Sequence, residues 1–224
     1  MKTGLVFFMV IAFAAAAGAG LIYYENEAQY MFALWGQEVT WVNFDYLPNG
    51  TPLATGAPLT GLEWASQHVV FSSAGNSLAT AAPGIGGASS RPNTLAVVNS
   101  GSPYDSLLIT FTDPAVAAGL TFIGPDFADQ GDRIIVRATD GTIMAEMPMS
   151  YAGMATPGID IGFFAGFISD TPIGSIEFLR IASEGDPIRY DNLIFQPVPE
   201  PAAMLILAVG AVGLALRGRR KMQR

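Results

Sequence analysis

Two carboxylates stand in the segments where the first and last long strands of this chain are expected. Asp45 lies in residues 38–46, and Asp191 lies in residues 188–195. The terminal strands of a β-sandwich often lie side by side, so we expect these side chains to meet. Neighbouring carboxylates are costly unless a proton or cation joins them, and oxygen ligands suit Ca²⁺. The pair therefore predicts a structural calcium site, with the alternative that each carboxylate satisfies only local backbone groups.

The tryptophans offer a second kind of chemistry, the stacking of sugar rings on flat aromatic faces. The chain contains 14 Phe and three Trp, and most of these rings are expected in the core. Only a ring at the surface beside polar groups favours binding. The candidate glycan-stacking residues are Trp35, Trp41 and Trp64.

Hydrolytic chemistry has weaker support in the sequence. His68 is the single histidine, and the segment GNSLA at 75–79 lacks the final glycine of a G-x-S-x-G nucleophile elbow. The 19 acidic residues allow a glycosidase-like pair, but no spacing singles one out. The chain has no cysteine, which excludes disulfides, thiolate metal sites and a cysteine nucleophile. We expect no catalytic residues, and a secreted carbohydrate-active hydrolase is the competing interpretation.

The charges are segregated along the chain. Five of the 11 basic residues lie in 217–224 and one is Lys2, so the region between carries five Arg against all 19 acids. Its net charge is near −14 (5 − 19). Nucleic acid requires a basic surface, so it is excluded as a partner. The acidity is explained by solubility of an exported domain, with a cation-binding surface as the alternative.

The elements that must position these groups are short β-strands. Apolar, β-branched and aromatic runs recur between turn residues, and the TDG at 139–141 predicts a hairpin turn. A one- or two-turn helix is expected around 61–66. The pattern predicts one all-β sandwich of about ten strands over residues 20–195. The expected strands are 38–46, 69–73, 94–98, 107–113, 119–124, 132–138, 142–147, 163–169, 175–181 and 188–195.

The N-terminal segment is typical of a secretory signal peptide. Lys2 precedes an apolar core over 5–17, and Ala17-Gly18-Ala19 has the small-x-small pattern that a signal peptidase recognises. We therefore expect export through the secretion translocon and cleavage after Ala19, with a signal peptide over 1–19. An uncleaved anchor helix is the alternative, because apolar residues continue to Tyr24.

The C-terminal segment has three successive parts. Pro199, Glu200 and Pro201 precede an uninterrupted apolar run over 202–216. A helix of that length is ~22 Å long, shorter than the ~30 Å hydrocarbon core of a bilayer, so a buried core helix is the alternative. The run has no polar face, however, and the basic cluster after it would hold that end in the cytoplasm. We expect a linker at 196–201, a transmembrane helix at 202–216 and a cytoplasmic tail at 217–224. The basic cluster is Arg217, Arg219, Arg220 and Lys221.

This tail resembles the PEP-CTERM protein-sorting signal of Gram-negative bacteria. Val198-Pro199-Glu200-Pro201, the apolar run and the basic cluster stand in the order of that signal. The resemblance implies recognition by an exosortase, a membrane-embedded transpeptidase-like enzyme that cleaves near Pro-Glu-Pro. It also implies anchoring in the inner membrane during transit, followed by a place at the cell surface or in the extracellular matrix.

A second resemblance covers most of the central region. The segments VNFDYLPNGTPL, LLITFTDPAVAAGLTF and YDNLIF look like those of jelly-roll ectodomains, which resemble lectins and carbohydrate-binding modules. This resemblance implies a single jelly-roll β-sandwich. The combined interpretation is a non-catalytic structural or interaction component of exopolysaccharide or biofilm, with extracellular polysaccharide as its expected partner.

Overall fold

The computed structural model describes residues 20–74, 77–81, 93–98, 106–123, 132–149, 162–179 and 188–198. Within them, α1 spans Glu27–Ala33 and a 3-10 turn, η1, spans Ala65–Gln67. All other regular elements are strands, which confirms the all-β prediction. The strands are β1 Leu21–Tyr24, β2 Thr40–Val42, β3 Pro58–Leu59, β4 Val69–Ser72, β5 Ser77–Ala81, β6 Thr94–Val98, β7 Leu107–Ile123, β8 Arg133–Ala138, β9 Ile143–Pro148, β10 Gly162–Leu179 and β11 Arg189–Pro197.

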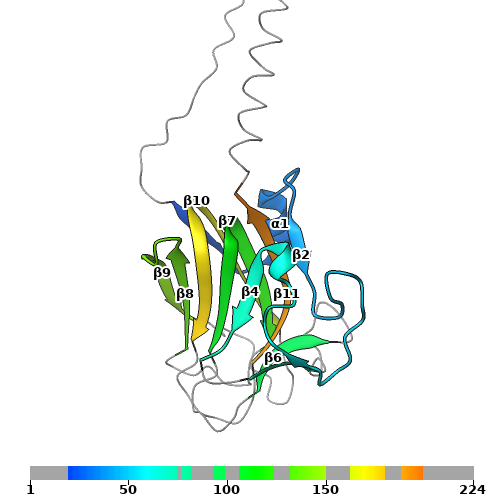
Figure 1. Ribbon diagram of the computed structural model, residues 1–224. Helices are drawn as coiled ribbons and strands as arrows, with labels where there is room; N and C mark the ends of the chain where they lie inside the picture. Colours follow the sequence, from blue (N-terminus) through cyan, green and yellow to red (C-terminus); the bar gives the residue numbers. More distant parts are fainter. Residues whose placement is uncertain are drawn as a thin grey trace, which may run out of the picture.

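Two long antiparallel strands, β7 and β10, run through both layers of the sandwich (Figure 1). The register between them shifts between Ile168 and Ser175, and Pro114 and Pro172 lie within that irregular stretch. Proline cannot donate to a ladder, so inside a sheet it occupies edges and bulges. Strands that change layer do so through such bends and bulges.

The described strands therefore form two layers that share β7 and β10. In the first layer the order is β9-β8-β10-β7-β4. In the second it is β1-β10-β7-β11, continued by β6, β5 and β3, and β2 also pairs with β11. The sequence predicted four strands over the stretches that β7 and β10 cover. Pairing continues across the bends because both partners are irregular at the same place.

An aromatic cluster fills part of the core between the layers. Phe44, Trp64 and Phe71 meet edge to face, with ring centroids 5.2 to 5.6 Å apart. Trp64 is 1% exposed. Its ring is enclosed by these neighbours, so the prediction that Trp64 stacks on a glycan is wrong.

The turn predictions are confirmed. The β8–β9 hairpin closes with Ala138 N–H donating to Thr142 O at 2.9 Å, and Gly141 has the positive φ of 85° that its Asp-Gly sequence permits. The short helix expected near 61–66 is the 3-10 turn η1.

In the described chain, pairing within the sheet begins at β1 and ends with β11. β1 pairs with β10, so residues 21–24 belong to the sheet and an anchor helix reaching Tyr24 is wrong. At the other end, β11 continues to Pro197, and Val198 N–H donates to Pro114 O at 2.8 Å. The expected linker at 196–201 therefore begins too early, because hydrogen bonding to the sheet continues through Val198.

The predicted signal peptide at 1–19, Pro199 to Pro201, the apolar run and the basic cluster lie outside the described residues. Among the described helices, none has the length and apolar composition needed to span a membrane.

Candidate functional site

The one α-helix of the described chain, α1, packs on the outer face of the second layer. Asn26 caps its start, because the Asn26 side-chain oxygen accepts a hydrogen bond from Gln29 N–H at 3.1 Å. Tyr30 and Leu34 face the sheet and pack with Ala117, Phe164 and Ile194 in a separate apolar cluster. A seven-residue helix is marginal in isolation. Its position therefore depends on this tertiary contact.

Tyr30 fixes the helix through both its ring and its hydroxyl. The ring is fully buried, 5.3 Å from that of Phe164 between centroids. The hydroxyl donates to Ile194 O at 3.2 Å, which ties α1 to β11. Burial raises the pKa of Tyr30, so the hydroxyl remains a donor throughout the neutral range.

Two glycines make room for this ring. Gly119 of β7 and Gly166 of β10 are cross-strand partners. A Cβ at Gly166 would lie 2.6 Å from a Phe164 ring carbon and 2.7 Å from Tyr30 Cδ2. A Cβ at Gly119 would lie 2.5 Å from Phe164 Cζ. The sheet therefore has no side chain at the two positions over which the Tyr30 ring lies.

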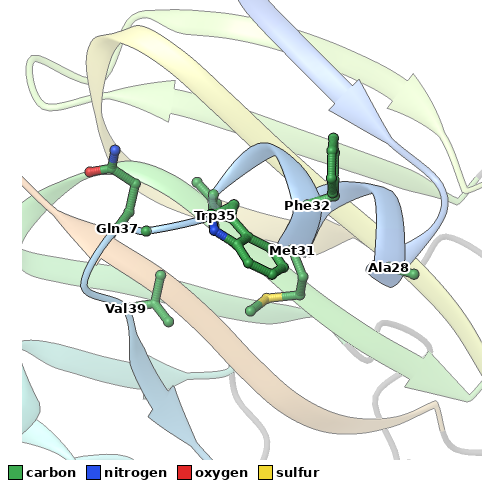
Figure 2. A pocket seen from close by; sticks show the side chains of 8 residues that line it. Ala28, Met31, Phe32, Trp35, Gln37 and Val39 are labelled. Carbon is green, nitrogen blue, oxygen red and sulfur yellow. The ribbon is translucent and has the colours of Figure 1, made fainter.

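An apolar surface extends over α1 and the residues that follow it. We call it the α1 surface and define it as Met31, Phe32, Trp35, Gln37 and Val39. Met31 and Val39 are half-buried because they pack against the Tyr30 cluster. Phe32 is 75% and Trp35 82% exposed, with ring centroids 6.4 Å apart. These residues help to line an open pocket of about 490 Å³. Figure 2 shows Met31 next to the Trp35 ring and Phe32 projecting from the helix.

Trp41 belongs to the same face of the sheet. It is the cross-strand partner of Ile194, which packs under α1. Because such partners point to the same side, Trp41 also points outward, and it is 47% exposed. An amide pair lies on this side too, with Gln196 Nε2 donating to Gln37 Oε1 at 3.2 Å. Of the three tryptophans predicted to stack on a glycan, Trp35 and Trp41 thus lie on one outer face and Trp64 lies in the core.

Asp45 and Asp191 are both buried, at 4% and 0% exposure. Asp191 lies in β11, but Asp45 lies outside any strand, because only Thr40–Val42 of the predicted strand 38–46 forms a strand, β2, which pairs with β11. One carboxylate oxygen of Asp45 accepts Asn93 N–H at 2.7 Å, which is the backbone role considered as the alternative. Among the described residues, no three His, Cys, Asp or Glu side chains are grouped to hold a metal ion. The calcium site stays a prediction.

A carboxylate that the sequence analysis did not single out lies near Asp191. Burial and then the negative charge of Asp191 raise the pKa of Glu27, at the start of α1. The two residues are 164 positions apart, and a helix missed in the sequence carries one of them. No local signal indicates this proximity.

His68 pairs with the first bend of β7. The side chain of His68 contributes one contact, since its Nδ1 is 3.1 Å from an oxygen of Asp113, and both side chains are about half exposed. The backbone contributes a second contact, in which the His68 carbonyl accepts a hydrogen bond from Thr112 N–H at 2.9 Å. At this residue, which ends η1, φ is positive at 66°. These contacts tie the η1 turn to β7.

Comparison with known proteins identifies the C-terminal segment. Residues 197–221 match the PEP-CTERM protein-sorting motif. The chain therefore carries this sorting motif at its C-terminal end, and the first two matched residues, Pro197 and Val198, are still bonded to the sheet. The motif indicates export, membrane-anchored transit and processing by an exosortase. A comparison with curated proteins finds no match.

Solved structures similar to the chain are carbohydrate-binding and adhesin domains. The K2 cleaved adhesin domain of Lys-gingipain has 12% identity and a TM-score of 0.44, with 71% of this chain and 99% of that chain covered. A mutant of the family 29 carbohydrate-binding module CBM29-2 has 12% identity and a TM-score of 0.35, covering 70% and 91%. A second mutant of that module has 11% identity and a TM-score of 0.37, covering 72% and 99%. At these identities and TM-scores the likenesses carry no functional inference for this chain.

Proposed function

We propose that this protein is a non-catalytic, glycan-binding component of the cell surface or extracellular matrix of a Gram-negative bacterium. It reaches that place after signal-peptide cleavage and exosortase processing. The observation that carries the binding proposal is the exposure of Trp35 and Trp41 on one face of the sandwich. Trp64 is buried in the same fold. The exposure of Trp35 and Trp41 therefore depends on where these two residues lie in the fold.

Trp41 is the stacking position best held by the fold. It lies in a strand paired to β11, and the neighbouring Val42 is 1% exposed in the core. Its backbone is therefore fixed before a ligand arrives, which lowers the entropic cost of binding. Large aromatic side chains combine apolar area with a polar edge, and they are enriched where ligands bind.

Amide and carboxylate groups on this face would orient a sugar. Gln37 and Gln196 each hold an amide there, and Glu27 supplies a partly buried carboxylate at the start of α1. Hydrogen bonds to such fixed groups give orientation and specificity, while the ring supplies contact area. The support is thus strongest for a ligand that is flat on one side and rich in hydroxyls.

The test is binding of the full chain, held in detergent micelles, to an array of bacterial and plant polysaccharides. We expect at least one polysaccharide to bind, and Trp41→Ala to weaken that binding about tenfold, which corresponds to ~1.4 kcal/mol. Ile143→Ala, which removes an exposed side chain on β9, is the matched control and should leave binding unchanged.

Two results would contradict this proposal. Either an array without any bound glycan, or equal binding by wild type and Trp41→Ala, removes the stacking role. Shortening of a bound polysaccharide during incubation would instead support the hydrolase alternative.

A further inference from the structure

The end of the sandwich that leads to the sorting motif carries several exposed apolar side chains. One row of cross-strand partners crosses the second layer there and consists of Ile22, Ile168, Ala117 and Gln196. Ile22, at one edge of the row, is 55% exposed. Gln196, at the other end, contacts Gln37 of the α1 surface. In Figure 1, β11 ends beside α1 at this end of the sandwich.

The chain that follows is too short to hold this end away from a membrane. Val198 is bonded to the sheet, and only Pro199, Glu200 and Pro201 separate it from the apolar run that begins at Ala202. Four steps of ~3.3–3.6 Å reach at most ~14 Å. The headgroup region takes up ~5–8 Å of that distance. The distance that remains between the sheet and the headgroups is smaller than the ~10–12 Å width of a helix with its side chains. Because α1 lies beside this point, it reaches the headgroups.

The composition of the α1 surface suits uncharged contact with lipid. Trp residues concentrate at membrane–water interfaces because their rings have an apolar body and a polar edge. Gln37 is the one polar side chain of the α1 surface as defined above. Residues 20–74 contain no Lys or Arg, whereas Glu27 begins the helix and Glu25 and Glu38 lie before and after it. Attraction to anionic lipid is therefore excluded as the cause of contact.

We propose that the α1 surface lies in the headgroup region of the membrane while the C-terminal segment holds the chain there. Phe32 and Trp35 enter the interface, and the sheet then holds Val198 at a fixed height above it. This places Pro-Glu-Pro, the next three residues, at the membrane boundary for processing. The proposal concerns the anchored chain, and it stands whether or not the released protein binds a glycan.

The test uses the full chain in nanodiscs of zwitterionic phosphatidylcholine, with or without bromine on the acyl chains near the headgroup. Bromine quenches a tryptophan that contacts it. We expect quenching in wild type and in Trp41→Phe, and loss of most of that quenching in Trp35→Phe. Trp64 is buried and gives a constant background. Since Trp35 is 82% exposed, its replacement should leave the melting temperature unchanged, which verifies that the variant is folded.

Several results would overturn the proposal. They are no quenching in wild type, equal quenching in wild type and Trp35→Phe, or quenching that rises strongly when anionic lipid is added. Absence of quenching in lipid, together with crosslinking of position 32 to a membrane enzyme in cells, would assign the surface to a protein partner instead. Phe32→Ala is a second variant and should reduce the quenching of Trp35.

Discussion

Replacement of Tyr30 tests most sharply how the α1 surface is held. Tyr30→Ala removes a fully buried ring that packs 5.3 Å from Phe164 and 5.9 Å from Tyr24, between ring centroids. It also removes the hydrogen bond to Ile194 O. Truncation of a buried aromatic residue to Ala costs ~3–5 kcal/mol. In a domain of this size each kcal/mol lowers the melting temperature by ~2–4 °C, so we expect a fall of about 10 °C.

Two further variants separate the contributions. Tyr30→Phe keeps the ring and loses only the hydroxyl, so the expected cost is ~1 kcal/mol. Phe32→Ala is the matched control, because it truncates an aromatic side chain of the same helix that is 75% exposed. Its expected cost is below ~0.5 kcal/mol.

The assay is thermal unfolding of the full-length proteins in the same detergent, followed by circular dichroism and by tryptophan emission. Emission from Trp35 should change in Tyr30→Ala below the main transition, because α1 separates from the sheet first. Equal stability losses in Tyr30→Ala and Phe32→Ala, or a loss below ~1 kcal/mol for Tyr30→Ala, would refute the role given to this ring.

Three other perturbations have definite expected results. Gly166→Ala places a methyl group 2.6 Å from the Phe164 ring and should destabilise the protein by ~1–3 kcal/mol in denaturant unfolding; a neutral effect would mean that the Tyr30 ring is not seated on the glycine. The raised pKa of Glu27 makes its ionisation unfavourable in the fold, so stability should fall as pH rises from about 4.5 through the folded-state pKa. Glu27→Gln should remove that fall and stabilise the protein at pH 7 by less than ~1 kcal/mol, and an unchanged pH profile would contradict the proximity to Asp191. Calcium held by Asp45 and Asp191 predicts that a chelator lowers the melting temperature of calcium-loaded protein and that added Ca²⁺ restores it; no change on chelation would exclude the site.

The strands of the sandwich are largely predictable because their signal is local. β4, β6, β8, β9 and the start of β11 all lie within a residue or two of the segments expected from apolar and β-branched runs. β7 and β10 appear as two strands each in the sequence, because Asp, Pro and Gly interrupt their apolar pattern. The interruption is a bend between layers rather than an end of pairing.

The sequence analysis also missed β3 and β5, and two further missed elements, β1 and α1, have a different physical origin. β1 directly follows the apolar N-terminal segment, so its residues continue that hydrophobic signal instead of marking a new strand. α1 has seven residues and depends on Tyr30 meeting two glycines that lie far away in the sequence. Propensity alone does not indicate such a helix.

Tryptophan exposure shows the same limit for the candidate site. Trp41 and Trp64 are indistinguishable by residue type, and only the packing of Phe44 and Phe71 around Trp64 separates core from surface. By contrast, the sorting motif is recognised as a linear sequence. Export and exosortase processing were therefore predictable from the sequence, while the exposure of the tryptophans required the fold.

The intact mass of the protein recovered from outside the producing cells tests the account most directly. Export followed by processing predicts a species that begins near Gly20 and ends within or close to Pro199–Pro201, so that both terminal segments are absent. Replacement of Pro199, Glu200 and Pro201 by alanine should leave the C-terminal segment attached and the protein in the membrane fraction. A full-length 23.6 kDa species outside the cells, or an unchanged mass and location in the alanine variant, would contradict the account.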